Sequence, residues 1–131
     1  MSYVIITNND GDLNELLTQH QDNITVHLVK GNIRDVAFQA RELLMGSYSL
    51  VADPVAGRLE RPTPYLTIIL KENKQSEVTM GDEIIRVEYF VKVYNEHKEH
   101  LEQLSDRYRR DFREIDKSLT LGCCTQMLMG Q

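Results

Sequence analysis

The sequence has few cysteines and no long apolar run, and these two absences exclude several classes of protein. Its only cysteines are the adjacent Cys123 and Cys124, whereas a disulfide framework needs separated pairs. No stretch approaches the roughly 20 consecutive apolar residues of a membrane span. We therefore expect a cytoplasmic protein, in a reducing compartment and without membrane contact.

Positive charge is also scarce. The chain has 15 Lys and Arg residues against 20 Asp and Glu residues, a formal net charge of -5. The densest basic run, Arg107 to Arg113, is interleaved with acidic residues, which is typical of a solvated helix face. Nucleic acids and anionic membranes attract a positive surface, so we expect neither as a partner.

Motifs that bind cofactors or perform catalysis are missing as well. The turn Asn8–Gly11 is not glycine-rich in the manner of a dinucleotide or phosphate loop, so no nicotinamide, flavin or ATP cofactor is expected. The sequence contains no recognisable nucleophile–base or paired-carboxylate motif. It assigns no catalytic residue, cofactor or metal ligand, and it favours a protein without chemistry of its own.

What is present is the pattern of one α/β domain over residues 1–131. Buried strands are predicted at 3–7, 24–29, 49–52 and 66–70, from their β-branched and aromatic content. Helices are predicted after Asp12, with Leu13, Leu16 and Leu17 inward, and after Asn32, whose side chain suits an N-cap. The second helix carries Ile33, Val36, Ala37, Ala40, Leu43 and Leu44 on one face and ends at Gly46.

The alternation of strands and helices predicts a small three-layer, Rossmann-like sheet with helices on both faces. Strands one to three are expected to be parallel, and their order in the sheet is left open. If the first strand lies between the second and the third, the loops after strands one and three come together. No helix separates strands three and four, so the fourth is expected to be antiparallel.

The second half of the chain has a helical pattern. A helix over about 82–104 is predicted to face the core with Ile84, Ile85, Val87, Phe90, Val91 and Tyr94. A helix over 105–119 is predicted to do so with Tyr108, Phe112, Ile115 and Leu119. The sequence assigns no structure to the apolar tail, 122–131. Two amphipathic helices exceed what a small sheet can cover, so a homodimer is an open possibility.

The main candidate site is the pair of loops after strands one and three, because ligands of open α/β sheets bind at the carboxyl ends of strands. The loop over 53–65 contains all three prolines, and loops of this length are often functional. Its guanidinium groups suit a small anionic ligand. The same residue types also serve ordinary turns. The predicted ligand-binding residues are Thr7, Asn8, Asn9, Asp53, Gly57, Arg58, Arg61 and Tyr65.

Two further candidates are weaker. His97 and His100 share a helix face, but a stable metal site needs a third ligand, and the surrounding charges indicate an exposed helix. Cys123 and Cys124 are not spaced as Cys-x-x-Cys, and adjacent cysteines beside an apolar tail are usually packing residues.

Three features of the first seventy residues occur together: Thr7–Asn9 after an apolar strand, the run 52–57 (Ala-Asp-Pro-Val-Ala-Gly) and the Pro-Thr-Pro-Tyr run at 62–65. In these features the chain resembles the GrdX family. Asp53 and Arg58 stand where that family often has histidine and serine. GrdX proteins are encoded beside the glycine reductase machinery of amino-acid-fermenting anaerobes. The resemblance implies an accessory role in glycine, sarcosine or betaine reductase metabolism, with reductase-complex proteins as partners.

Three interpretations follow. One is an accessory or binding protein of that metabolism. Another is a small enzyme or sensor of an anionic metabolite, with Asp53 as acid or base and Arg58 and Arg61 as an anion clamp. The third is a structural homo-oligomer whose helices pair.

Overall fold

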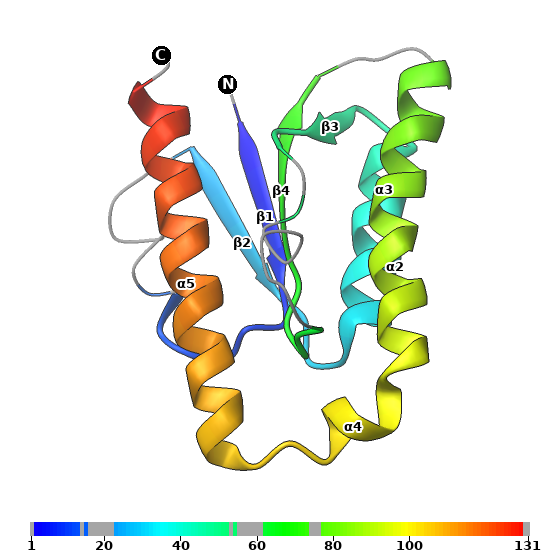
Figure 1. The fold of residues 1–131 in the computed structure, drawn as a ribbon. Helices are drawn as coiled ribbons and strands as arrows, with labels where there is room; N and C mark the ends of the chain where they lie inside the picture. Colours follow the sequence, from blue (N-terminus) through cyan, green and yellow to red (C-terminus); the bar gives the residue numbers. More distant parts are fainter. Residues whose placement is uncertain are drawn as a thin grey trace.

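The computed structural model describes residues 2–13, 15, 23–52, 54, 62–73 and 77–129, and Figure 1 shows its arrangement. The regular elements among them are β1 (Tyr3–Thr7), β2 (Ile24–Leu28), α2 (Ile33–Leu44), β3 (Tyr48–Leu50), β4 (Thr67–Glu72), α3 (Glu77–Glu96), α4 (Lys98–Glu102) and α5 (Asp106–Met129).

The four strands form one mixed sheet in the order β2-β1-β4-β3. β1 and β2 are parallel, whereas β4 is antiparallel to both of its neighbours, β1 and β3. The predicted Rossmann-like sheet of three parallel strands is therefore wrong, because the sheet has one parallel pair. The sequence left the strand order open, and β1 lies between β2 and β4, not between β2 and β3. β3 and β4 are antiparallel, as expected.

The strand order follows from how much apolar surface each strand has to bury. Leu66 and the first four residues of β4 are all buried, and a strand that is apolar on both faces belongs in the middle of a sheet. β3 has only three residues, and short strands suit an exposed edge. β4 therefore lies beside β1, and β3 lies at the edge of the sheet.

Helices cover both faces of this sheet, with α2 and α3 on one side and α5 on the other (Figure 1). Val4 and Ile6 of β1 belong to the core with α2 and α3, while Tyr3 and Ile5 belong to the core with α5. All five residues of β1 are buried. The prediction of a strand buried on both faces is confirmed.

The α2 helix agrees with the sequence in both its start and its inward face. The Asn32 side chain accepts hydrogen bonds from the backbone of Arg34 and Asp35, and the Asp35 carboxylate accepts one from the Asn32 backbone. This reciprocal capping satisfies amide groups that a helix start leaves unpaired. The chain leaves the helix at Met45 and Gly46. Of the residues predicted in the preceding helix, Leu13 is fully buried, whereas Leu16 and Leu17 lie outside the described residues.

The remaining helices differ from their predicted limits. α3 begins at Glu77, earlier than predicted, and the chain breaks at His97 before the short α4. α5 runs to Met129, through most of the tail that had no predicted structure. The prediction that Ile85 faces the core is wrong, because it is 69% exposed. Val87 and Tyr94 are buried as expected.

The inward face of α5 is the largest local correction. Tyr108 is 57% exposed and Ile115 is 42% exposed, so neither faces the core as predicted. The buried positions of the described part of this helix are Asp116, Thr120, Cys123 and Cys124. The side of α5 that meets the sheet is thus polar over Asp116 and Thr120.

Candidate functional site

A hydrogen-bonded cluster joins β1, β4 and α5 at the carboxyl end of β1. Thr67 Oγ1 donates to Asp116 Oδ2 at 2.8 Å, which uses its only proton. The 2.7 Å contact between the hydroxyls of Thr7 and Thr67 is therefore donated by Thr7. Thr7 Oγ1 in turn accepts from the backbone of Asn9 at 3.0 Å. We call Thr7, Asn9, Thr67 and Asp116 the Asp116 cluster.

The side chain of Asn9 closes this cluster into a ring. Its amide donates to Asp116 Oδ2 at 2.8 Å and to the Arg113 carbonyl at 3.0 Å. Its own carbonyl oxygen accepts from the Gly11 backbone at 3.1 Å. Burial raises the pKa of the Asp116 carboxyl above its ordinary value, and the hydrogen bonds from Asn9 and Thr67 oppose that rise. The cluster fixes α5 against the sheet.

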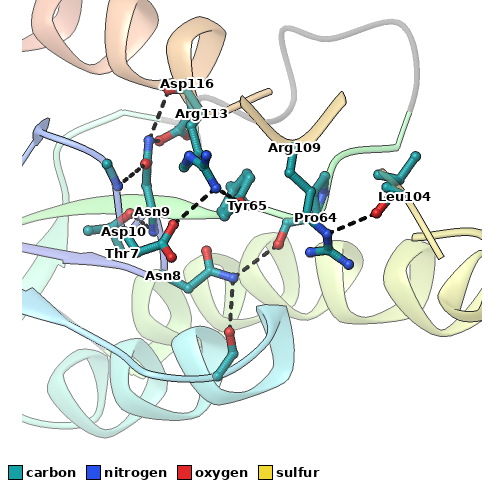
Figure 2. Close-up of polar contacts among 12 residues, drawn as sticks. Thr7, Asn8, Asn9, Asp10, Pro64, Tyr65, Leu104, Arg109, Arg113 and Asp116 are labelled. Carbon is teal, nitrogen blue, oxygen red and sulfur yellow. Dashed lines mark hydrogen bonds and ion pairs between the residues drawn. The ribbon is translucent and has the colours of Figure 1, made fainter. Parts of the chain in front are cut away.

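Asn8 joins three other segments of the chain. Its amide donates to the carbonyls of Gly31 at 3.3 Å and Pro64 at 3.0 Å (Figure 2). Its carbonyl accepts from the Leu66 backbone at 2.9 Å. Both amide protons are used. Asn8 therefore positions the chain after β2 and before β4, and its polar groups are already committed to protein partners.

These segments surround a pocket of about 610 Å³ at the carboxyl ends of β1 and β2, which we call the strand-end pocket. Its volume is in the range of small-molecule sites. Polypeptide from β1, β2, the start of α2, the approach to β4, α3, α4 and α5 contributes to it. The lining residues are Asn8, Asp10, Leu28, Val29, Lys30, Gly31, Asn32, Pro64, Tyr65, Tyr94, Leu101, Glu102 and Arg109.

Two arginines of α5, Arg109 and Arg113, make polar contacts beside the pocket. Arg113 Nη1 donates to the Tyr65 hydroxyl at 3.1 Å and lies 3.5 Å from Asp10 Oδ1. The Arg109 guanidinium donates to the backbone carbonyls of Leu101, Glu102 and Leu104 at 3.1 to 3.2 Å. Figure 2 shows Arg109, Arg113 and Asp116 pointing from α5 toward the strand ends. α5 is thus one wall of the site.

The opposite side of the pocket includes Tyr94 of α3, whose hydroxyl donates to Glu102 Oε1 at 3.3 Å. Burial, and then the Glu102 carboxylate, raise the pKa of the Tyr94 hydroxyl. The hydroxyl is therefore a proton donor at neutral pH and not a base. Its ring also lies under the guanidinium of Arg34, 5.9 Å from the centroid.

The structure places four of the predicted site residues together and leaves four undescribed. Thr7, Asn8, Asn9 and Tyr65 all lie at the carboxyl end of β1, and Asn8 and Tyr65 line the pocket. Thr7 and Asn9 instead belong to the Asp116 cluster. The other predicted residues, Asp53, Gly57, Arg58 and Arg61, lie outside the described residues, so their role stays a prediction.

Sequence reasoning missed Thr67, Arg109, Arg113 and Asp116. The last three recur at intervals of four and three residues, the spacing of one helix face. That signal was present in the sequence, but the interleaved charges resembled a solvated surface. Another face of the same helix carries Tyr108, Phe112 and Ile115, and its apolar spacing was a stronger signal than the spacing of Arg109, Arg113 and Asp116.

The weaker sequence candidates gain no support as reactive groups. Burial, and then Cys123, raise the pKa of the Cys124 thiol to about 11, so it is not a ready nucleophile. Both cysteines are buried and free. Within residues 2–13, 15, 23–52, 54, 62–73 and 77–129, no group of three or more His, Cys, Asp or Glu side chains is arranged to hold a metal ion.

The fold and the site define a small α/β protein with a pocket at one edge of a mixed sheet. A family model described as GrdX-like protein matches residues 4–124, and the chain therefore belongs to the GrdX-like family. The match extends well beyond the first seventy residues, on which the resemblance rested. No curated protein and no solved structure matches the chain. In the part of the chain that the structure describes, no helix is both long and apolar enough to cross a membrane.

Proposed function

We propose that this GrdX-like protein is an accessory protein of glycine or betaine reductase metabolism that binds a small charged metabolite in the strand-end pocket. Family membership supports the metabolic context. The single observation that carries the binding role is the pocket itself, about 610 Å³ in volume, at the carboxyl ends of the parallel pair β1 and β2. Ligands of α/β sheets bind at such ends.

The neighbourhood of the pocket also favours binding over catalysis. Asn8 has both amide protons bonded to carbonyls. Arg109 is occupied with the backbone around α4, and the Tyr94 hydroxyl has a raised pKa. These groups shape the pocket and are poorly placed to exchange protons with a ligand. The alternative in which Asp53 acts as acid or base depends on a residue outside the described part.

A thermal-shift screen with glycine, betaine, phosphate esters and nucleotides tests the binding role. A ligand present at about 100 times its Kd should raise the Tm by several degrees. Lys30→Ala should reduce that rise, because Lys30 is an exposed cation in the pocket lining. Lys98→Ala, on α4 and outside the pocket lining, is the matched control and should leave the rise intact. If no compound stabilises the wild type, the binding role is wrong.

The accessory role is tested separately, by a pull-down of reductase subunits with the tagged protein from a cell that expresses both. We expect at least one subunit to be recovered at a fixed ratio. Recovery of none, under low-salt conditions that preserve weak complexes, would count against the accessory role without touching the binding role.

A homo-oligomer is the second candidate function, and one observation favours it. Ile85 and Tyr89 lie one turn apart on α3 and are 69% and 59% exposed, and exposed apolar patches often mark contact surfaces. Light scattering of the wild type and of Ile85→Glu tests it. A dimer that the substitution converts to a monomer would support this candidate, and a wild-type monomer at high concentration would reject it.

A further inference from the structure

We propose that the strand-end pocket selects small dipolar ions, molecules that carry one ammonium and one carboxylate group, over simple anions and simple cations. This inference rests on the proposed function and names the chemical class of its ligand. It departs from the anionic ligand that the sequence alone suggested, because the charges that line the described pocket are balanced.

The pocket has one acid and one base on each of two walls. After β1 and β2, whose last residues are paired in register, come Asp10 and Lys30. On the helical wall, Glu102 ends α4, and Arg109 of α5 donates to its backbone carbonyl at 3.1 Å. Each wall therefore places one positive and one negative charge beside the pocket, although Arg109 and Glu102 also have protein partners.

The start of α2, which also borders the pocket, is closed to an anion. The backbone N–H groups of Arg34 and Asp35 already donate to the Asn32 side chain, at 2.9 and 3.3 Å. The Asn32 N–H donates to the Asp35 carboxylate at 2.9 Å. A helix start binds anions through free amides and its positive dipole end. Here the amides are used, and Asp35 supplies the negative charge.

These charges act differently on the three kinds of ligand. A simple anion in the pocket is attracted by Lys30 and Arg109 but repelled by Asp10 and Glu102. A simple cation meets the reverse set of forces. A dipolar ion avoids this cancellation, because it can turn its carboxylate toward a base and its ammonium toward an acid. The energy of each pairing falls with distance, so orientation decides affinity.

A triplet of probes of nearly equal shape tests the selectivity. Betaine carries both charges, 3,3-dimethylbutyrate replaces its nitrogen with carbon and keeps only the carboxylate, and choline keeps only the ammonium. Glycine, acetate and methylammonium form a smaller triplet. Calorimetric titration of the full chain should give, in each triplet that binds, the tightest binding for the dipolar member.

Removing one acid should shift this preference in a defined direction. In Glu102→Gln the new amide oxygen can still accept the hydrogen bond from the Tyr94 hydroxyl, but the negative charge is lost. The lining then has one acid, Asp10, against two bases, Lys30 and Arg109. We expect betaine to bind roughly fivefold more weakly relative to 3,3-dimethylbutyrate, about the size of one charge–charge interaction near 4 Å in a water-like medium. Glu99→Gln, on the same helix α4 but outside the pocket lining, is the matched control and should change nothing.

The outcomes separate this inference from the proposed function. If an anion or a cation binds as tightly as the dipolar member of its triplet, the selectivity is wrong while the binding role stands. An unchanged preference in Glu102→Gln also overturns the selectivity. If no member of either triplet binds and the broader screen finds no ligand, both proposals fail together.

Discussion

The two faces of the sheet are covered in different ways. On the α2 and α3 side, β1 and β4 present Val4, Ile6, Ile68 and Leu70, and all are part of one apolar core. On the α5 side, the same strands present apolar residues at one end but Thr7 and Thr67 at the other. The helix that covers these threonines, α5, buries the polar side chains of Asp116 and Thr120 there in place of aliphatic ones.

This difference has consequences for how each helix is held. Apolar packing is non-directional and follows buried area, whereas the contacts of α5 near the pocket depend on the geometry of the Asp116 cluster. The Thr120 hydroxyl is fully buried and has no hydrogen-bond partner among the described residues. Such a group is unfavourable for stability. The α5 side of the sheet is therefore the less optimised one, and it is the side that carries Arg109 into the pocket.

The largest expected contrast comes from two neighbouring residues of β4 that face opposite ways. Ile68→Ala should destabilise the protein by about 2–5 kcal/mol, because it leaves a cavity in a fully buried apolar core. Thr67→Val keeps the shape but removes a donor to Asp116, and it should cost about 1–3 kcal/mol. Urea unfolding measures both. A larger cost for Thr67→Val than for Ile68→Ala would contradict the distinction between the two faces.

A double-mutant cycle on Thr67 and Asp116 sharpens the comparison. Asp116→Ala leaves the Thr67 hydroxyl and the Asn9 amide without their shared acceptor. Once one partner is gone, loss of the other should cost less, so we expect a coupling free energy of about 0.5–3 kcal/mol. The pair Ile68→Ala and Asp116→Ala, on opposite faces, is the control and should be additive within about 0.5 kcal/mol.

The Asp116 cluster should also give the stability of the protein a particular pH dependence. Burial raises the pKa of Asp116 in the folded state, so the folded chain binds this proton more tightly than the unfolded chain does. The contribution of Asp116 to stability is then greatest below its unfolded pKa and is lost as pH rises through its folded pKa. Asp116→Asn removes the titration.

Measuring wild type and Asp116→Asn by urea unfolding at several pH values isolates this contribution, because the other carboxyl groups titrate in both. The stability of the wild type relative to the variant should fall as pH rises above the ordinary range of an aspartate. A difference that is constant with pH, or that rises, would show that the carboxyl is not perturbed in this direction.

The same contrast explains which parts of the fold the sequence predicted. The α2 helix was predictable because its cap, its inward stripe and its end are all local signals. The strand order was not, since it depends on competition between β3 and β4 for the central place beside β1. Periodicity locates strands but does not say which neighbour each one takes.

The candidate site was predicted in part for related reasons. The turn after β1 was found because Asn8 and Asn9 follow a buried strand directly. Thr67 and Asp116 were missed, because a polar residue on the inward face of a helix or strand resembles an outward one until its partner is known. Apolar periodicity identifies an apolar interface, and it therefore placed Tyr108 and Ile115 of α5 in the core, although Leu119 does pack there.

The smallest expected effect tests whether α3 and α5 differ as helices or only in what they contact. Gly81 and Gly122 lie within them, and a Cβ added at either meets nothing within 4 Å. Ala at each position should stabilise the protein by about 0.5–1 kcal/mol through helix propensity. We expect equal gains, because propensity is a property of the helix backbone and not of the face it covers. If only Gly81→Ala raised the stability, the two helices would differ in their own backbones. The end of α5 would then open before the rest of the protein unfolds.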